Sequence, residues 1–139
     1  MQRLRVLIAD DHADARRLIQ EVLRSNFDVV GAVEDGRRLI DAAVQLRPDV
    51  IVSDVNMGVL SGPDAMTELR NTGHEIPFVL VSVETLNVEE RIRQGAKGFV
   101  DKRDLVEELA PAVHSAFKGS IYLSRGARWS LLFRGNKKD

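Results

Sequence analysis

Carboxylates, a hydroxyl and an ammonium group follow short apolar runs at four places in the chain. The residues are Asp10, Asp11, Asp54, Ser82 and Lys102. Short apolar runs bounded by proline, glycine or polar residues are typical of buried strands. Parallel strands in open α/β sheets place reactive groups together at their carboxyl ends. We therefore expect these five side chains to share one crevice.

The residue types predict a site for a divalent cation and a phosphoryl group. Carboxylates a few ångströms apart raise one another's pKa, and a hard cation such as Mg²⁺ relieves this repulsion. Asp54 ends the apolar run 50–54, and a carboxylate there could attack a phosphoryl donor to form an aspartyl phosphate. Lys102 and Ser82 would then neutralise and hydrogen-bond the phosphoryl oxygens.

Alternating strand and helix patterns position these groups. Apolar, β-prone runs predict strands at residues 4–9, 29–33, 50–54, 77–82 and 98–101. Apolar residues at helical spacing predict a helix after each strand, at about residues 15–24, 36–46, 62–71, 88–94 and 105–117. The fourth of these helices is expected to be short and marginal because it holds few apolar residues.

This order of elements predicts an α/β fold. Five strands joined by short helical crossovers indicate a flavodoxin-like, doubly wound, five-stranded parallel sheet with strand order 2-1-3-4-5. Helices on both faces make three layers. The first and third strands are then neighbours, which brings Asp10 and Asp11 next to Asp54.

The composition of the chain excludes several classes of protein. The chain has 139 residues, 44% of them apolar and 29% charged, with a formal net charge of -1 and no cysteine. One domain is expected, without a disulfide framework or a thiolate metal site. The charge balance argues against an overall basic nucleic-acid binder. The apolar stretch near the amino end is too short for a signal peptide or a spanning helix, so we expect a cytoplasmic protein without membrane attachment.

The chain resembles a known family, the response-regulator receiver domain, and some of its motifs resemble those of the NarL/LuxR type. The resemblance covers about residues 3–124. It rests on Ala9-Asp10-Asp11-His12, Asp54-Val55-Asn56-Met57, Ser82, Gly95-Ala96-Lys97-Gly98-Phe99, Lys102 and Tyr122-Leu123-Ser124, in that order.

The resemblance implies roles for residues at the acidic crevice. Asp54 would be the phosphoacceptor. Asp11, Asp54 and the backbone carbonyl of Asn56 would hold Mg²⁺, and Asp10 would act mainly through a water bound to the metal. Lys102 would contact the phosphoryl group.

The resemblance to receiver domains also implies a conformational switch. The hydroxyl of Ser82 would move toward the phosphoryl group, and the ring of Phe99 would rotate inward into the vacated space. The expected partners are a sensor histidine kinase or a phosphotransfer protein, together with a downstream protein. The resemblance leaves open whether the protein forms a homodimer.

The rest of the chain is expected to add little to this domain. Residues 1–124 would form the receiver, and residues 125–139 a tail or a short extra helix, with Trp129 and its apolar neighbours packing on the domain. Residues 125–139 are too few for a helix-turn-helix, so we expect no DNA binding by this chain alone.

Other interpretations remain open. A degenerate receiver could serve as a constitutive protein-interaction module; this alternative rests on Gly58, where the family usually has proline, and on the short fourth helix. An aspartyl-phosphate phosphatase would need a second aspartate at the position of Asn56, so no turnover of an external substrate is expected. Simpler roles are helix-start acids for Asp10 and Asp11, a strand cap for Ser82 and a core aromatic for Phe99. The histidines His12, His74 and His114 show no ligand spacing.

Overall fold

The strands form one parallel sheet. The computed structural model describes residues 3–136, and the strand order within them is β2-β1-β3-β4-β5-β6. The strands are β1 Arg5–Ala9, β2 Asp28–Val33, β3 Val50–Asp54, β4 Phe78–Ser82, β5 Gly98–Asp101 and β6 Tyr122–Leu123. The five predicted strands and their relative order are confirmed.

The sixth strand corrects the prediction of a five-stranded sheet. Tyr122 and Leu123 pair in parallel with Gly98 and Phe99 of β5, and the Ser124 amide donates to the Phe99 carbonyl at 3.0 Å. Two residues carry no alternation or apolar run that a sequence pattern could reveal. Backbone pairing with the otherwise free edge of β5, rather than side-chain pattern, makes this strand.

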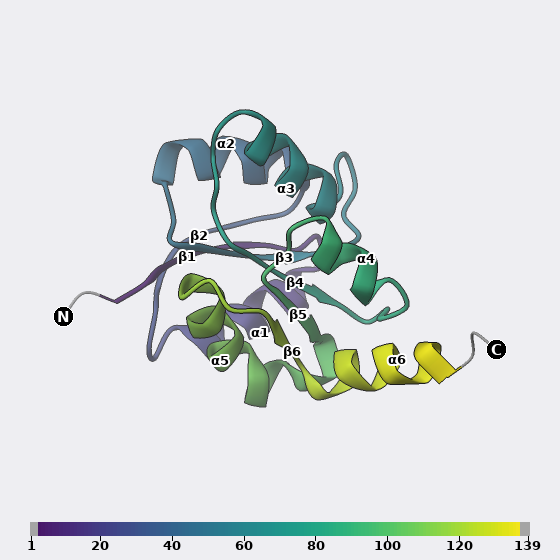
Figure 1. Cartoon of the computed structure of the whole chain (residues 1–139). Coiled ribbons are helices and arrows are strands. Elements are labelled where there is room, and N and C mark those ends of the chain that lie inside the picture. Colours follow the sequence, from purple (N-terminus) through teal and green to yellow (C-terminus); the bar gives the residue numbers. More distant parts are fainter. Residues whose placement is uncertain (1–2, 137–139) are drawn as a thin grey trace.

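Helices cover both faces of the sheet. They are α1 Ala13–Leu23, α2 Gly36–Leu46, α3 Gly62–Asn71, α4 Val88–Arg93, α5 Leu105–Phe117 and α6 Arg125–Asn136, with a short 3₁₀ helix, η1, at Lys102–Asp104. Figure 1 shows α2 and α3 above the sheet and α1 and α5 below it, which confirms the three layers. No helix within residues 3–136 is both long and apolar enough to cross a membrane.

Each face of the sheet has its own apolar core. Leu7 and Ala9 of β1 lie in a buried cluster with residues of α2 and α3. Val6 and Ile8, which alternate with them, lie in a second cluster with residues of α1 and α5. Successive side chains of a strand point to opposite faces, so a strand covered on both sides must be apolar at nearly every position.

Side-chain caps fix where the helices near the sheet edge begin. The Asp35 carboxylate accepts a hydrogen bond from the Arg38 amide at 2.8 Å at the start of α2. Ser61 accepts one from the Asp64 amide at 3.1 Å at the start of α3, and Pro63 occupies the first turn, where a missing N–H leaves no bond unmade. These caps hold the loops that follow β2 and β3.

α6 packs on the edge of the domain formed by β5 and α4. Ala127 is fully buried, and the Ser124 hydroxyl accepts hydrogen bonds from the amides of Asp101, at 2.9 Å, and Ala127, at 3.4 Å. Further along, the Ser130 hydroxyl hydrogen-bonds that of Thr85 in the loop after β4. α6 is thus attached to the two segments that follow β4 and β5.

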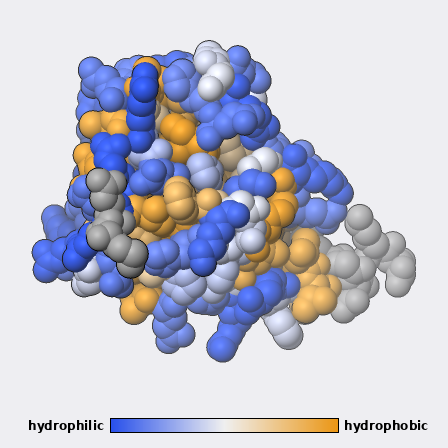
Figure 2. Space-filling view, turned by 60° about the vertical axis from the view of Figure 1, so that its left-hand side comes forward, coloured by the Kyte–Doolittle hydropathy of each residue, from blue (hydrophilic) through white to orange (hydrophobic). Residues whose placement is uncertain are grey.

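The apolar side chains of α6 do not all pack as predicted. Trp129 and Leu132 are 66% and 67% exposed, and the rings of Trp129 and Phe133 lie 6.4 Å apart. Figure 2 shows a largely hydrophilic surface with hydrophobic areas, one of them at the lower right near the end of α6. The helix is held by Ala127 and Ser130 instead, because small residues allow its backbone to approach the sheet. Residues 137–139 of the predicted tail lie outside the described residues.

Candidate functional site

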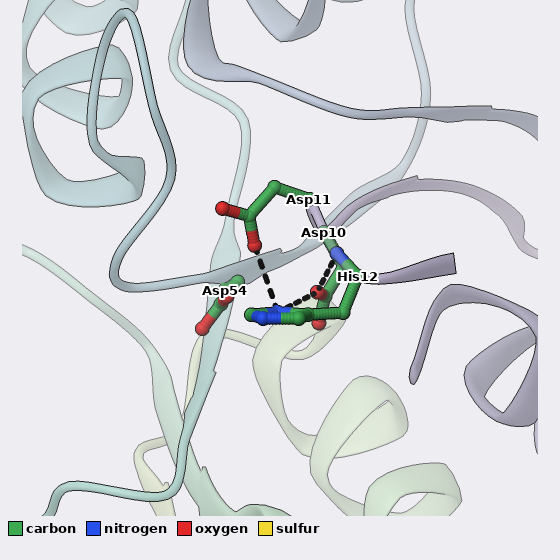
Figure 3. Close-up of side chains that lie close together, drawn as sticks. All are labelled: Asp10, Asp11, His12 and Asp54. Carbon is green, nitrogen blue, oxygen red and sulfur yellow. Dashed lines mark hydrogen bonds and ion pairs between the residues drawn. The ribbon is translucent and has the colours of Figure 1, made fainter. Parts of the chain in front are cut away.

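The ends of β1 and β3 place three carboxylates side by side (Figure 3). Ala9 pairs with Ser53 across the two strands, so Asp10 and Asp54, the next residues, face each other. Asp10 is fully buried and Asp54 is 5% exposed, whereas Asp11 is open to solvent. One oxygen from each of these three residues, and a ring nitrogen of His12, lie within 4.8 Å of one another.

Lys102 brings a positive charge to the two buried carboxylates. Its Nζ lies 2.9 Å from Asp10 Oδ2 and 3.5 Å from Asp54 Oδ2. The residue begins η1 directly after β5, and that turn is held because the Asp101 carboxylate accepts the Arg103 amide at 2.9 Å. The predicted meeting of the ends of β1, β3 and β5 is therefore present in the structure.

The Asp10 carboxylate is only partly satisfied. Its Oδ1 accepts the His12 amide at 2.9 Å, but its buried Oδ2 makes no hydrogen bond. The Lys102 ammonium, 2.9 Å away, forms an ion pair with this oxygen. The charge of Lys102 therefore compensates for the burial of this carboxylate.

Electrostatics make Asp54 an unusual carboxyl group. The pKa of Asp54 is raised from the ordinary 3.8 to about 6: burial is the largest cause, the charges of Asp10 and Asp11 also raise it, and Lys102 opposes the rise. Burial and repulsion together outweigh the single ammonium group. A divalent cation at this point would reverse the balance by favouring the ionised form. The donor set of clustered carboxylates is the kind that a hard cation such as Mg²⁺ prefers.

Backbone contacts fix the loop that follows Asp54. The Gly62 amide donates to the Val55 carbonyl at 3.1 Å, and a Cβ on Gly62 would lie 2.2 Å from the Asp54 carbonyl oxygen. Only glycine fits such an approach. By contrast, a Cβ on Gly58 would meet nothing within 4 Å, and the next residue, Val59, is 83% exposed with φ of 68°.

The two predicted switch residues lie beside this loop. Ser82 is 1% exposed, and its hydroxyl accepts the Glu84 amide at 3.0 Å. Phe99 is also 1% exposed and belongs to the apolar core on the face of the sheet that includes residues of α2, α3 and α4. Both line a cavity of about 200 Å³, with Asn56 on its wall. The hydroxyl at the end of β4 and the aromatic ring of β5 therefore share one space next to Asp54.

His12 is the residue of this site that sequence reasoning missed. Its Nδ1 lies 2.9 Å from Asp11 Oδ1 and 3.6 Å from Asp10 Oδ1, and Figure 3 shows its ring beside Asp10 and Asp54. Spacing to other histidines gave no signal. Its place directly after two acids at the end of a strand was the signal available, because the first residues beyond a strand end line the same crevice.

Comparison with known proteins shows the family of the chain. The family model for the response regulator receiver domain matches residues 6–114. A nitrate/nitrite response regulator protein homolog from Haemophilus influenzae is 34% identical, over 99% of this chain and 68% of that protein. The response regulator GacA of Pseudomonas aeruginosa is 33% identical, over 87% of this chain and 58% of that protein.

Solved structures give the same result. The response regulator domain of Thermotoga maritima CheB is 27% identical, with a TM-score of 0.76, covering 84% of this chain and 98% of that one. A LuxR-family two-component response regulator from Aurantimonas superposes with a TM-score of 0.85 at 20% identity, covering 98% of this chain and 100% of that one, and so supports the fold. The chain is a member of the response regulator receiver domain family.

Proposed function

We propose that the protein is a phosphoacceptor receiver of a two-component phosphorelay, phosphorylated on Asp54. One observation carries this proposal: the Asp54 carboxylate is buried at a strand end, with Lys102 Nζ 3.5 Å from it and a second buried carboxylate on the other side of that ammonium. A merely structural ion pair needs one carboxylate. Two buried acids around one lysine leave negative charge that a bound cation and a phosphoryl group can use.

Asp11, Asp54 and the Asn56 carbonyl would hold Mg²⁺, and Asp10 would support it through water. Bound there, Mg²⁺ would neutralise the phosphoryl oxygens and keep Asp54 ionised at neutral pH. Asp11 is solvent-exposed, so the ion has a path to the site. Asp10 Oδ2 is buried and paired with Lys102 Nζ at 2.9 Å, and it could also accept a hydrogen bond from a water in the ion's hydration shell.

In the phosphoryl transfer, the side chains of the site mainly position the phosphoryl group and neutralise its charge. An Asp54 carboxylate oxygen attacks the phosphorus of a phosphohistidine, so that the O–P bond forms as the P–N bond breaks. The leaving imidazole keeps the electron pair and takes a proton from solvent. Lys102 holds the phosphoryl oxygens, and no protein group needs to transfer a proton.

The switch would follow from competition for the Ser82 hydroxyl. Its oxygen now accepts the Glu84 amide, and its hydrogen would donate to a phosphoryl oxygen if the loop after β4 moved toward Asp54. The 200 Å³ cavity beside Ser82 and Phe99 provides room for that shift. A coupling of about 1–3 kcal/mol would change partner affinity about 5-fold to 150-fold.

The donor would be a sensor histidine kinase or a phosphotransfer protein, and the reader a downstream protein. Asn56 stands where a phosphatase of the aspartyl-phosphate type needs a second acid, so turnover of an external substrate is not part of the proposal. The relatives' own activities belong to longer chains; this one spans 30% of a protein-glutamate methylesterase of Nocardioides.

Beryllofluoride, a stable mimic of the phosphoryl group, provides the test. We expect that Mg²⁺ with beryllofluoride shifts the amide resonances of Asp54, Ser82 and their neighbours, and that an acid-stable, base-labile acyl phosphate forms with acetyl phosphate. The matched variant Asp54→Asn should show neither effect. A wild-type amide spectrum that stays unchanged would refute phosphorylation and favour a constitutive interaction module.

A further inference from the structure

The middle of α6 is attached to the segment that leads from Ser82 to α4. The Ser130 hydroxyl shares a hydrogen bond with that of Thr85, and Thr85 is a buried polar residue, 8% exposed. Val83 and Leu86, on either side of it, are 73% and 57% exposed, so apolar packing holds this segment weakly. The contact with α6 is therefore a main restraint on the segment that the switch has to move.

The start of α6 is fixed independently of that contact. The Arg125 amide donates to a carboxylate oxygen of Glu108 at 2.9 Å. The Gly126 amide donates to Asp104 at the same distance, and Ala127 is fully buried. Carboxylates that accept the first N–H groups of a helix also complement its dipole. The first turn of α6 is thus an anchor on η1 and α5, whereas the hydroxyl pair holds the helix further along.

The strand order sets the direction in which α6 restrains the segment after β4. In the sheet, β4 lies between β3, which ends at Asp54, and β5, with β6 beyond it. The helix α6 begins just after β6, on the side away from β3 (Figure 1). A shift of the segment after β4 toward Asp54 therefore carries Thr85 away from Ser130. A phosphoryl group on Asp54 and the hydroxyl of Ser130 would attract the same segment from opposite sides.

We propose that α6 is an autoinhibitory helix: the bond from Ser130 to Thr85 holds the segment after β4 away from a phosphorylated Asp54. Phosphorylation and this bond compete, so formation of the contact between Ser82 and the phosphoryl group loosens α6 beyond its anchored first turn. Coupling between two sites is reciprocal, so loss of the bond raises the affinity of the site for a phosphoryl mimic. The proposal rests on the phosphoacceptor function, since it concerns the regulation of the same site.

Titration of the whole chain with beryllofluoride at saturating Mg²⁺ measures this coupling, with the amide resonances of Asp54 and Ser82 as the readout. Ser130→Ala and Thr85→Val each remove one hydroxyl of the bond. The net contribution of an ordinary hydrogen bond corresponds to a factor of about 2–12 in an equilibrium constant. Each variant should therefore bind beryllofluoride more tightly than the wild type by about this factor. The double variant should gain no more than either single variant, because both changes remove the same bond.

Amide hydrogen exchange tests the loosening of the helix itself. Beryllofluoride should speed the exchange of the amides from Trp129 to Leu132 in the wild type, while the Ala127 amide in the anchored turn stays protected. Ser130→Ala should show the faster exchange without beryllofluoride. Ser25→Ala is the matched control, because Ser25 is an exposed serine beyond the end of α1, and it should equal the wild type in both measurements.

The outcomes separate this proposal from the function on which it rests. Equal beryllofluoride affinity in Ser130→Ala, Thr85→Val and the wild type would overturn the autoinhibitory role of α6 and leave phosphorylation of Asp54 intact. Gains that add in the double variant, or exchange in α6 that beryllofluoride leaves unchanged, would do the same. Failure of beryllofluoride to shift any wild-type resonance near Asp54 would instead overturn the phosphoacceptor function, and this proposal with it.

Discussion

Asp54→Asn should stabilise the protein in the absence of divalent cations. In the folded chain burial and neighbouring acids raise the pKa of Asp54 to about 6, against an ordinary 3.8. Between these values the folded state binds more protons than the unfolded state, so stability falls as pH rises through this window. The difference of about 2.2 pKa units corresponds to about 3 kcal/mol at pH 7 and above. Asparagine is nearly isosteric and has no charge to desolvate.

The assay is urea unfolding at two pH values in the presence of a chelator. At pH 8 the free energy of unfolding of Asp54→Asn should exceed that of the wild type by about 2–3 kcal/mol. At pH 4 wild-type Asp54 is mostly protonated in the folded chain, and the difference should shrink below about 1 kcal/mol. Asp14→Asn is the matched control, because the side chain of Asp14 is fully exposed, and it should change stability by less than about 0.5 kcal/mol.

Two results would refute this reasoning. A variant no more stable than the wild type at pH 8 would mean that the attraction to Lys102 outweighs burial and repulsion. A stabilisation that persists unchanged at pH 4 would mean that the effect comes from packing and not from charge. Mg²⁺ at about 100 times its dissociation constant should add about 2.7 kcal/mol to the wild type and much less to Asp54→Asn.

Three further outcomes follow from the loops around the site. Ser82→Ala should leave acyl-phosphate formation largely intact but reduce the phosphorylation-dependent change in partner affinity from about 5–150-fold to nearly none, which a pull-down with and without beryllofluoride measures. Gly62→Ala should destabilise the chain by about 1–3 kcal/mol in thermal unfolding, since its Cβ would lie 2.2 Å from the Asp54 carbonyl oxygen; Gly58→Ala, with open space around it, is the control and should change little. Val59→Gly should stabilise the chain by about 1 kcal/mol in the same assay, because φ of 68° is unfavourable for a β-branched residue; an unchanged or lower midpoint would contradict that reasoning.

Patterning was enough to predict the five long strands because β1, β3, β4 and β5 are buried on both faces and apolar along most of their length, while β2 at the edge is partly buried and still β-prone. The same strand ends then determined which acids meet, since parallel neighbours align Asp10 with Asp54. The distances between the side chains of the site could not be predicted from the sequence. The approach of Lys102 to two carboxylates at once depends on where η1 turns after β5.

The features that sequence reasoning missed lack a periodic pattern. β6 has two residues and forms through backbone pairing. His12 acts through its position after a strand end and not through spacing to other ligands. Trp129 was expected to pack because it is large and apolar, yet Ala127 fills the contact with the sheet. Close approach of a helix selects small residues at its inner face, and hydropathy alone does not rank them above aromatic ones.

α6 gives the protein its own optical reporter. Trp129 is the single tryptophan of the chain, and it neighbours Ser130, whose hydroxyl is bonded to Thr85 three residues beyond Ser82. Its emission therefore arises on the helix that is attached to the segment expected to move. The emission of an indole depends on its contact with water, and Trp129 is 66% exposed, so we expect its fluorescence to follow phosphorylation of Asp54 in the unlabelled protein, at low concentration and in real time.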